Sequence, residues 1–112
     1  MIDYEKKILD IVSQYLPSDD WWIFLFGSRA IGNADERADY DIGIFNINHP
    51  LSFQVIDNIV SVLEDSDIAF KIDIVDFSKV TENFRAIAGK KVVIWKKPKR
   101  QSQPDWLHYK QH

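Results

Sequence analysis

Four short apolar segments limit most strongly what this chain can fold into. They are residues 21–26 (WWIFLF), 40–45 (YDIGIF), 70–77 (FKIDIVDF) and 92–95 (VVIW). Apolar residues recur at helical spacing over residues 3–16 and 51–65, and residues 78–88 also predict a helix, which ends at Gly89. Because strands alternate with helices, we expect an α/β fold, a two-layer sandwich in which helices pack on one sheet.

The composition is that of one folded domain. Of 112 residues, 46% are apolar and 28% are charged, which is the usual balance of a globular protein. No apolar run approaches the ~20 residues of a membrane span, and the N-terminus has acidic residues where a secretory signal needs a basic start. We therefore expect a cytoplasmic protein with no membrane partner. The absence of cysteine excludes disulfides and cysteine-bound zinc.

The last seventeen residues (KKPKRQSQPDWLHYKQH) differ in composition from the rest of the chain. We expect a folded domain over residues 1–95 and a solvated, polar and basic tail over residues 96–112. His108 and His112 have the spacing of helical metal ligands, but no acidic third ligand accompanies them, so we interpret both as tail residues. An alternative is that the tail contacts a partner or nucleic acid through Lys96, Lys97, Lys99 and Arg100.

The net charge of −3 argues against a protein that mainly binds nucleic acid, because neutralising phosphates requires a cationic surface. It does not exclude a small polyanion that is held through a metal ion.

Carboxylates stand beside two of the predicted strands. Residues two apart on a strand point to the same face, so Asp39 and Asp41 lie ~7 Å apart at Cα and their side chains can converge. Asp73 is flanked by isoleucines in the third segment and joins them if the two strands are neighbours. Three such carboxylates repel one another, and oxygen-only ligands match Mg²⁺ or Mn²⁺ rather than zinc. Asp76 has the opposite parity and is interpreted as structural; plain surface positions for Asp39 and Asp41 are the alternative.

A Gly-Ser turn precedes these carboxylates. Gly27 has no Cβ, so a phosphate can approach the backbone closely, and Ser28 offers a hydroxyl and a backbone donor. If a helix begins after Ser28, its amides add an anion site. Arg29 can contact phosphate oxygens or, alternatively, pair with Asp35 or Glu36. A phosphate-binding turn beside carboxylate-bound metals is suited to in-line displacement at phosphorus.

The stretch from Leu25 to Ile44 (LFGSRAIGNADERADYDIGI) resembles the motif of the DNA polymerase β-like nucleotidyltransferase superfamily, in which Gly-Ser is followed by Asp-x-Asp and a later acidic residue. With its small size and residues 71–95, the chain is similar to the minimal nucleotidyltransferases (MNT) that act with a helical HEPN partner. The resemblance implies a mixed sheet with a nucleotidyltransferase core, two Mg²⁺ ions or Mn²⁺, and an NTP donor. The implied reaction transfers a nucleoside monophosphate, expected to be AMP from ATP, and releases pyrophosphate.

The resemblance also implies a role for each motif residue. Gly27 and Ser28 hold the triphosphate, Asp39 and Asp41 bind both metals, and Asp73 completes the metal site and acts as general base. The implied partner is a HEPN-type protein, encoded adjacently, that binds the acceptor or is itself the toxin that becomes modified. Nucleic acid enters only as an acceptor, and a homo-oligomer is compatible with the pattern.

Two positions depart from the family pattern. Ile31 stands where the family often has arginine, and Ala38 stands where it often has serine. An alternative function follows, in which the chain is an antitoxin that masks its partner by binding, with a weak or inactive nucleotide site.

Overall fold

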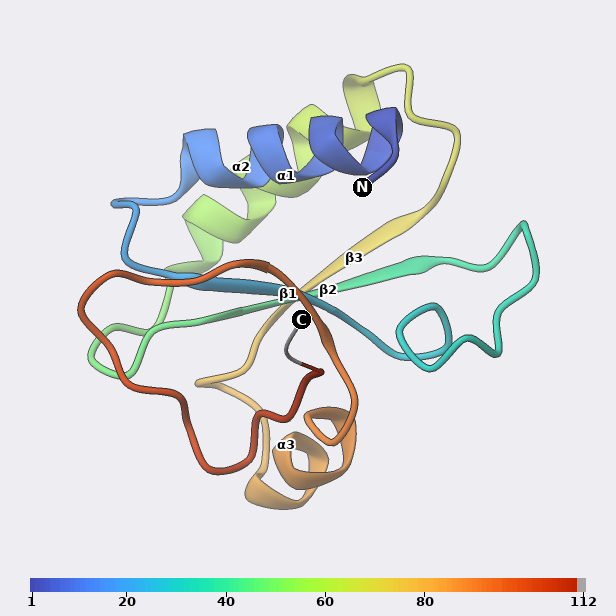
Figure 1. Ribbon diagram of the computed structural model, residues 1–112. Coiled ribbons are helices and arrows are strands. Elements are labelled where there is room, and N and C mark those ends of the chain that lie inside the picture. Colours follow the sequence, from blue (N-terminus) through green and yellow to red (C-terminus); the bar gives the residue numbers. More distant parts are fainter. Residues whose placement is uncertain (111–112) are drawn as a thin grey trace.

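The computed structural model describes residues 1–110, in which a four-stranded sheet has helices on both faces (Figure 1). The elements in chain order are α1 (Asp3–Tyr15), β1 (Trp22–Phe26), β2 (Tyr40–Phe45), α2 (Phe53–Asp65), β3 (Ile72–Asp76), α3 (Glu82–Ala88) and β4 (Val93–Lys96). The strand order is β3-β2-β1-β4. β2 pairs parallel with β3 and antiparallel with β1, which pairs antiparallel with β4. The predicted α/β fold with a mixed sheet is confirmed.

One face of the sheet packs against α1 and α2, which lie side by side above it in Figure 1. Alternation along β2 sends Tyr40, Ile42 and Ile44 into this layer, where all three are fully buried. The helices contribute Ile8, Val12, Ile59 and Leu63 to the same core. Ser52 caps α2 by accepting a hydrogen bond from the N–H of Val55 at 3.3 Å.

The third helix is shorter than the predicted span of residues 78–88. Asp76 accepts hydrogen bonds from the N–H and hydroxyl of Ser78 at 2.9 and 2.7 Å, which fixes a turn after β3. Thr81 then caps α3, which begins at Glu82. Such side-chain hydrogen bonds compete with the helical ladder, and they delay the start of the helix here.

The other face of the sheet is covered by α3 and by the later part of the C-terminal segment, residues 97–110, which Figure 1 shows passing around the sheet and then beneath the strands. Leu107 is fully buried, and the Trp106 ring stacks on Phe77 with centroids 5.5 Å apart. The expectation of a solvated tail is therefore wrong for this segment. Although most of the segment is polar, the adjacent residues Trp106 and Leu107 are apolar and pack under the sheet.

Backbone hydrogen bonds also attach this segment to the domain. The N–H of Val92 donates to the carbonyl of His108 at 3.0 Å, and the N–H of His108 donates to the carbonyl of Gly89 at 2.8 Å. Lys96, placed in the tail by the sequence, ends β4. The second predicted tail histidine, His112, lies outside the described residues.

Among the helices that the structure describes, none combines the length and apolar character needed to cross a membrane.

The buried position of Leu107 predicts that the C-terminal segment contributes directly to stability. We expect Leu107→Ala to lower the free energy of unfolding by ~2–5 kcal/mol, because it leaves a cavity in a packed core. Urea denaturation measures this change, with Ser102→Ala, at an exposed position of the same segment, as the matched control. Equal stability of the two variants would contradict the packing described here.

Candidate functional site

The turn after β1 brings the backbone against a carboxylate. Gly27 has φ +75°, a conformation that favours glycine, and a Cβ at this position would lie 2.3 Å from Oδ2 of Asp41. The N–H groups of Ala30 and Ile31 donate to the Gly27 carbonyl at 3.1 and 3.3 Å and close the turn. Residues 28–38 continue as turns and loop, so the possible helix after Ser28 does not form.

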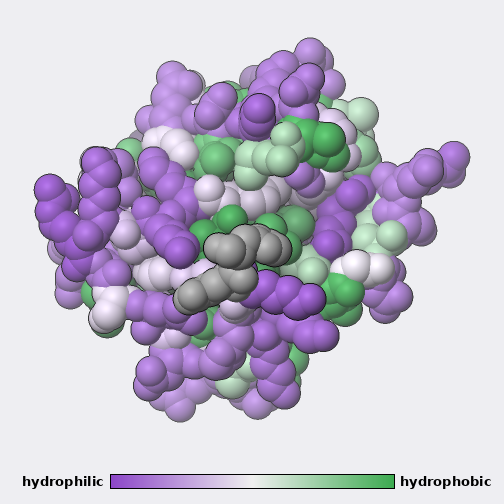
Figure 2. Space-filling view, in the orientation of Figure 1, coloured by the Kyte–Doolittle hydropathy of each residue, from purple (hydrophilic) through white to green (hydrophobic). Residues whose placement is uncertain are grey.

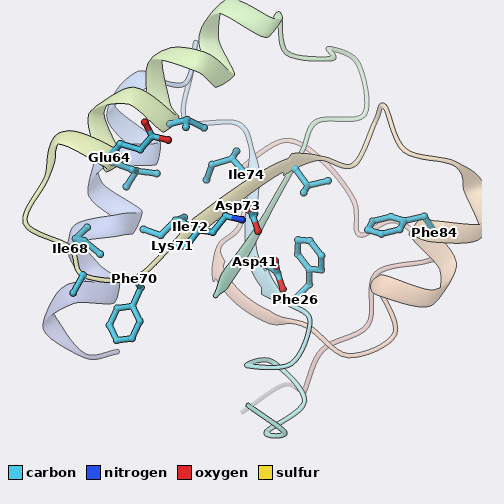
Figure 3. A pocket seen from close by; sticks show the side chains of 14 residues that line it. Phe26, Asp41, Glu64, Ile68, Phe70, Lys71, Ile72, Asp73, Ile74 and Phe84 are labelled. Carbon is cyan, nitrogen blue, oxygen red and sulfur yellow. The ribbon is translucent and has the colours of Figure 1, made fainter. Parts of the chain in front are cut away.

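The parallel pairing of β2 with β3 places two of the predicted carboxylates side by side. Asp41 and Asp73 are register partners, and both are half-buried. They line one cavity of about 720 Å³, in which Figure 3 shows them close together near Phe26. Asp39 precedes β2, has the same parity as Asp41, and is exposed. The second and third strands are therefore neighbours, which was the condition for Asp73 to approach Asp41.

The charges in this pocket act on one another. Burial raises the pKa of Asp41 above its ordinary value, and the negative charges of Asp73 and Asp39 raise it further, whereas Lys71 lowers it. The three aspartates offer oxygen ligands only, and a divalent cation would relieve the repulsion between their negative charges. This set of donors therefore fits Mg²⁺ or Mn²⁺.

The expected cage of three carboxylates is not fully assembled. Within residues 1–110, no group of three Asp, Glu, His or Cys side chains is close enough to hold a metal ion as it stands. The physical reason lies in the backbone: strand register fixes Asp41 opposite Asp73, whereas Asp39 belongs to a loop and has no strand partner.

Arg29 is not brought to the carboxylates. Its guanidinium lies 4.0 Å from the centroid of the Tyr40 ring, on the face of the sheet that α1 and α2 cover. It donates from Nε to the carbonyl of Ala38 at 2.9 Å and from Nη2 to the carbonyl of Glu36 at 3.1 Å. The structural alternative is thus the one observed, although the partners are backbone carbonyls rather than acidic side chains. Arg29 holds the loop that ends at Asp39.

Asp76 has the structural role predicted for it. It is buried, and besides its bonds to Ser78 it accepts a hydrogen bond from the N–H of Leu51 at 2.8 Å. It therefore joins the loop after β2 to the end of β3.

Sequence reasoning missed the walls of the cavity. Lys71 lines it two residues before Asp73, and the alternation of a strand places the two on the same face. Phe26 and Phe84 also line the cavity, and Phe84 keeps 41% of its surface exposed. Parity could have indicated Lys71. The two aromatic residues are far apart in sequence and only the packing of α3 brings them together.

A Gly-Ser turn packed against register-paired carboxylates on a mixed sheet is the arrangement of a nucleotidyltransferase. The family described as "Polymerase beta, Nucleotidyltransferase" matches residues 6–100, and the chain belongs to this family. A relative from Haemophilus influenzae, named "Probable protein adenylyltransferase MntA", is 34% identical in an alignment of length 109, which covers 95% of this chain and 95% of the relative. The expected nucleotidyltransferase class is confirmed.

Solved structures share this fold. A toxin-antitoxin complex with AMP-PNP contains a chain with TM-score 0.69 and 20% identity, matched over 86% of this chain and 75% of the other. A complex of tri-AMPylated Shewanella oneidensis HEPN toxin with MNT antitoxin matches with TM-score 0.58 and 18% identity, over 86% of this chain and 71% of the other. These structures confirm the fold, and the 34% identical relative named MntA confirms the resemblance to MNT proteins found in the sequence.

Two glycines allow the role of the turn to be tested. Gly27 and Gly32 both have positive φ, at +75° and +77°, but only a Cβ at Gly27 meets the Asp41 carboxylate. We expect Gly32→Ala to lose ~1–2 kcal/mol of stability from backbone strain, and Gly27→Ala to lose at least as much, because its Cβ also clashes with the Asp41 carboxylate. Nucleotidyl transfer should fall only in Gly27→Ala. Thermal unfolding and pyrophosphate release measure the two effects, and equal activity of both variants would show that close contact with Asp41 is not required.

The raised pKa of Asp41 predicts how stability depends on pH. The folded protein keeps this carboxyl protonated to higher pH than the unfolded chain does, so the group's stabilising contribution is present at acidic pH and lost as pH rises through the folded pKa. In metal-free buffer we expect Asp41→Asn to be modestly more stable than the unmodified protein at pH 7 and equally stable below pH about 4. Denaturation at both pH values tests this, and a less stable variant at pH 7 would contradict it.

Proposed function

We propose that this protein transfers AMP from ATP to a hydroxyl group of a HEPN-type protein partner and releases pyrophosphate. The observation that carries the proposal is the register pairing of Asp41 with Asp73 directly against the Gly27 turn. This arrangement puts a phosphate-binding backbone within contact distance of paired carboxylates. The name of the Haemophilus influenzae relative, a protein adenylyltransferase, supports AMP as the transferred group and protein as the acceptor.

Each side chain has a defined task in this proposal. Gly27 and Ser28 bind the β- and γ-phosphates through backbone N–H groups and the serine hydroxyl. Asp41, Asp73 and the loop residue Asp39 would hold two Mg²⁺ ions, or Mn²⁺, which when bound offset the charge of the phosphates and of the leaving pyrophosphate. Asp73 accepts the proton of the attacking hydroxyl, because it lies on the outer strand of the pair and faces the cavity.

The loop between Gly27 and Asp39 is held in place from the opposite face of the sheet. Arg29 Nη1 donates to the Tyr40 hydroxyl at 3.3 Å, and this hydroxyl donates to Glu5 on α1 at 3.1 Å. Burial raises the pKa of Tyr40, so the hydroxyl stays protonated and keeps donating to Glu5. The backbone that bears Asp39 is therefore anchored at the start of β2, two residues before Asp41.

The proposed partner is a HEPN-type protein encoded beside this chain. One structural neighbour with the same fold is described as a complex of a tri-AMPylated HEPN toxin with an MNT antitoxin. By this analogy, the protein acts as an antitoxin that neutralises its partner by modifying it.

A masking antitoxin with a weak nucleotide site is the second candidate. It is favoured by the position of Arg29, which is committed to the loop and not to phosphate binding, and by the exposed Ile31 at a position where the family often has arginine. In this case neutralisation depends on binding alone.

The carboxylate pair provides the decisive test. We expect Asp41→Asn and Asp73→Asn each to reduce AMP transfer by more than ~100-fold, since even indirect contacts to a bound metal are worth 10–100-fold. The assay incubates the protein with the HEPN-type partner, Mg²⁺ and labelled ATP, and follows label on the partner together with relief of its toxicity. Asp57→Asn, at an exposed position on α2, is the matched control.

The outcomes separate the two candidates. Loss of transfer together with loss of neutralisation supports modification. Neutralisation that survives both substitutions would instead identify a masking antitoxin.

A further inference from the structure

One edge of the sheet is open at the site itself. β3 is the outermost strand beside β2, and no strand of residues 1–110 pairs with its other side. The Lys71 carbonyl accepts from Tyr40, and the Phe77 N–H donates to Ile44, so odd-numbered residues of this strand bond to β2. In a parallel pair the alternate residues direct their N–H and C=O away from the partner. The backbone groups of Ile72 and Ile74 therefore face the open edge.

The cavity at the carboxylates extends across this edge. It is lined by Ile72 and Ile74, which point toward α2, and also by Asp73 and Val75, which point to the opposite face. Figure 3 shows the two isoleucines and the two paired aspartates around the same strand. Because residues on both faces of β3 line this cavity, the cavity passes around the free edge of the strand. The backbone of β3 is therefore accessible within it.

The walls beyond the edge are mainly apolar, with Glu64 and Lys71 as charged members. Val60 and Leu63 of α2 lie on one side, and Phe26 and Phe84 lie on the other. Ile87 follows Phe84 by one helical turn and is 61% exposed, which extends the apolar rim along α3. The exposed side chains of Phe84 and Ile87 beside an unpaired strand mark a surface that another chain covers.

We propose that the acceptor enters as an extended polypeptide segment that pairs with β3 as an additional strand. The inference rests on the proposed function and names how the acceptor is recognised. A polypeptide supplies both donors and acceptors to the open edge, and its alternate side chains fit the apolar walls. A nucleic-acid strand, by contrast, has no alternating N–H and C=O groups with which to continue the sheet at this edge.

This pairing places the reacting group. Neighbouring strands lie ~4.8 Å apart, so the side chain opposite Asp73 projects on the same face as Asp73 and Asp41. A hydroxyl on that side chain attacks the α-phosphorus of ATP. The bond between the hydroxyl oxygen and the α-phosphorus forms, the bond to the β-phosphate oxygen breaks, pyrophosphate leaves, and the hydroxyl proton passes to Asp73. Specificity then arises from strand register, because only one acceptor residue lies opposite Asp73.

Proline at position 74 tests the edge with little effect on the β2 ladder. Ile74→Pro removes an N–H that points to the open side, and proline is tolerated on edge strands at such positions. Ile74→Ala is the matched control, since it removes the same packing but keeps the N–H. With the HEPN-type partner as acceptor, we expect transfer by Ile74→Pro to be about tenfold lower than by Ile74→Ala, with the loss in KM for the partner. Affinity for a fluorescent ATP analogue should be the same in both.

Hydrogen exchange on the unmodified protein provides a second measurement. Peptides covering residues 70–77 should become protected when the HEPN-type partner binds, because the outward N–H groups gain acceptors. Equal transfer by the two variants, or unchanged exchange in these peptides during active transfer, would overturn the strand-pairing inference alone. Absence of any transfer by the unmodified protein would overturn the proposed function and the inference with it.

Discussion

The parallel register of β2 and β3 is the constraint on which the site depends. It sets Asp41 opposite Asp73, and the Gly27 turn closes against the same carboxylate. Two like charges in a half-buried pocket are unfavourable for folding, as the raised pKa of Asp41 records. The fold tolerates this because both side chains reach a cavity, and the repulsion is the property that makes the pocket suitable for cations.

Aromatic side chains pack on the face of the sheet that α3 covers, and they support this geometry. Gly43 lies between the carboxylate end of β2 and Phe45, and a Cβ there would meet the Phe24 ring at 2.2 Å. The Phe24 ring in turn contacts Phe77 edge to face, with centroids 4.8 Å apart. Trp106 from the C-terminal segment completes the layer by stacking on Phe77. The C-terminal segment is therefore part of the aromatic layer that packs beneath the site.

Much of the fold follows from local pattern. Period-two alternation correctly separated the two faces of β2, and helical spacing located α1 and α2 within a few residues. The sequence pattern gave wrong predictions for the C-terminal segment and for the start of α3, where a few side chains matter more than the average composition. Trp106 and Leu107 anchor a segment whose other residues are mostly polar, and Asp76 delays α3 through hydrogen bonds to Ser78. Neither effect has a periodic signature.

The sequence by itself determined the candidate chemistry: a glycine-serine turn, an Asp-x-Asp pair and a third aspartate on a later strand, with parity that puts them on one face. Tertiary structure decided which of these groups meet. The strand register pairs Asp41 with Asp73, whereas Asp39 lies on the loop before β2. The Arg29 guanidinium packs on the Tyr40 ring, on the opposite face of the sheet. The open edge of β3 is likewise invisible in the sequence, because strand order depends on contacts between segments distant along the chain.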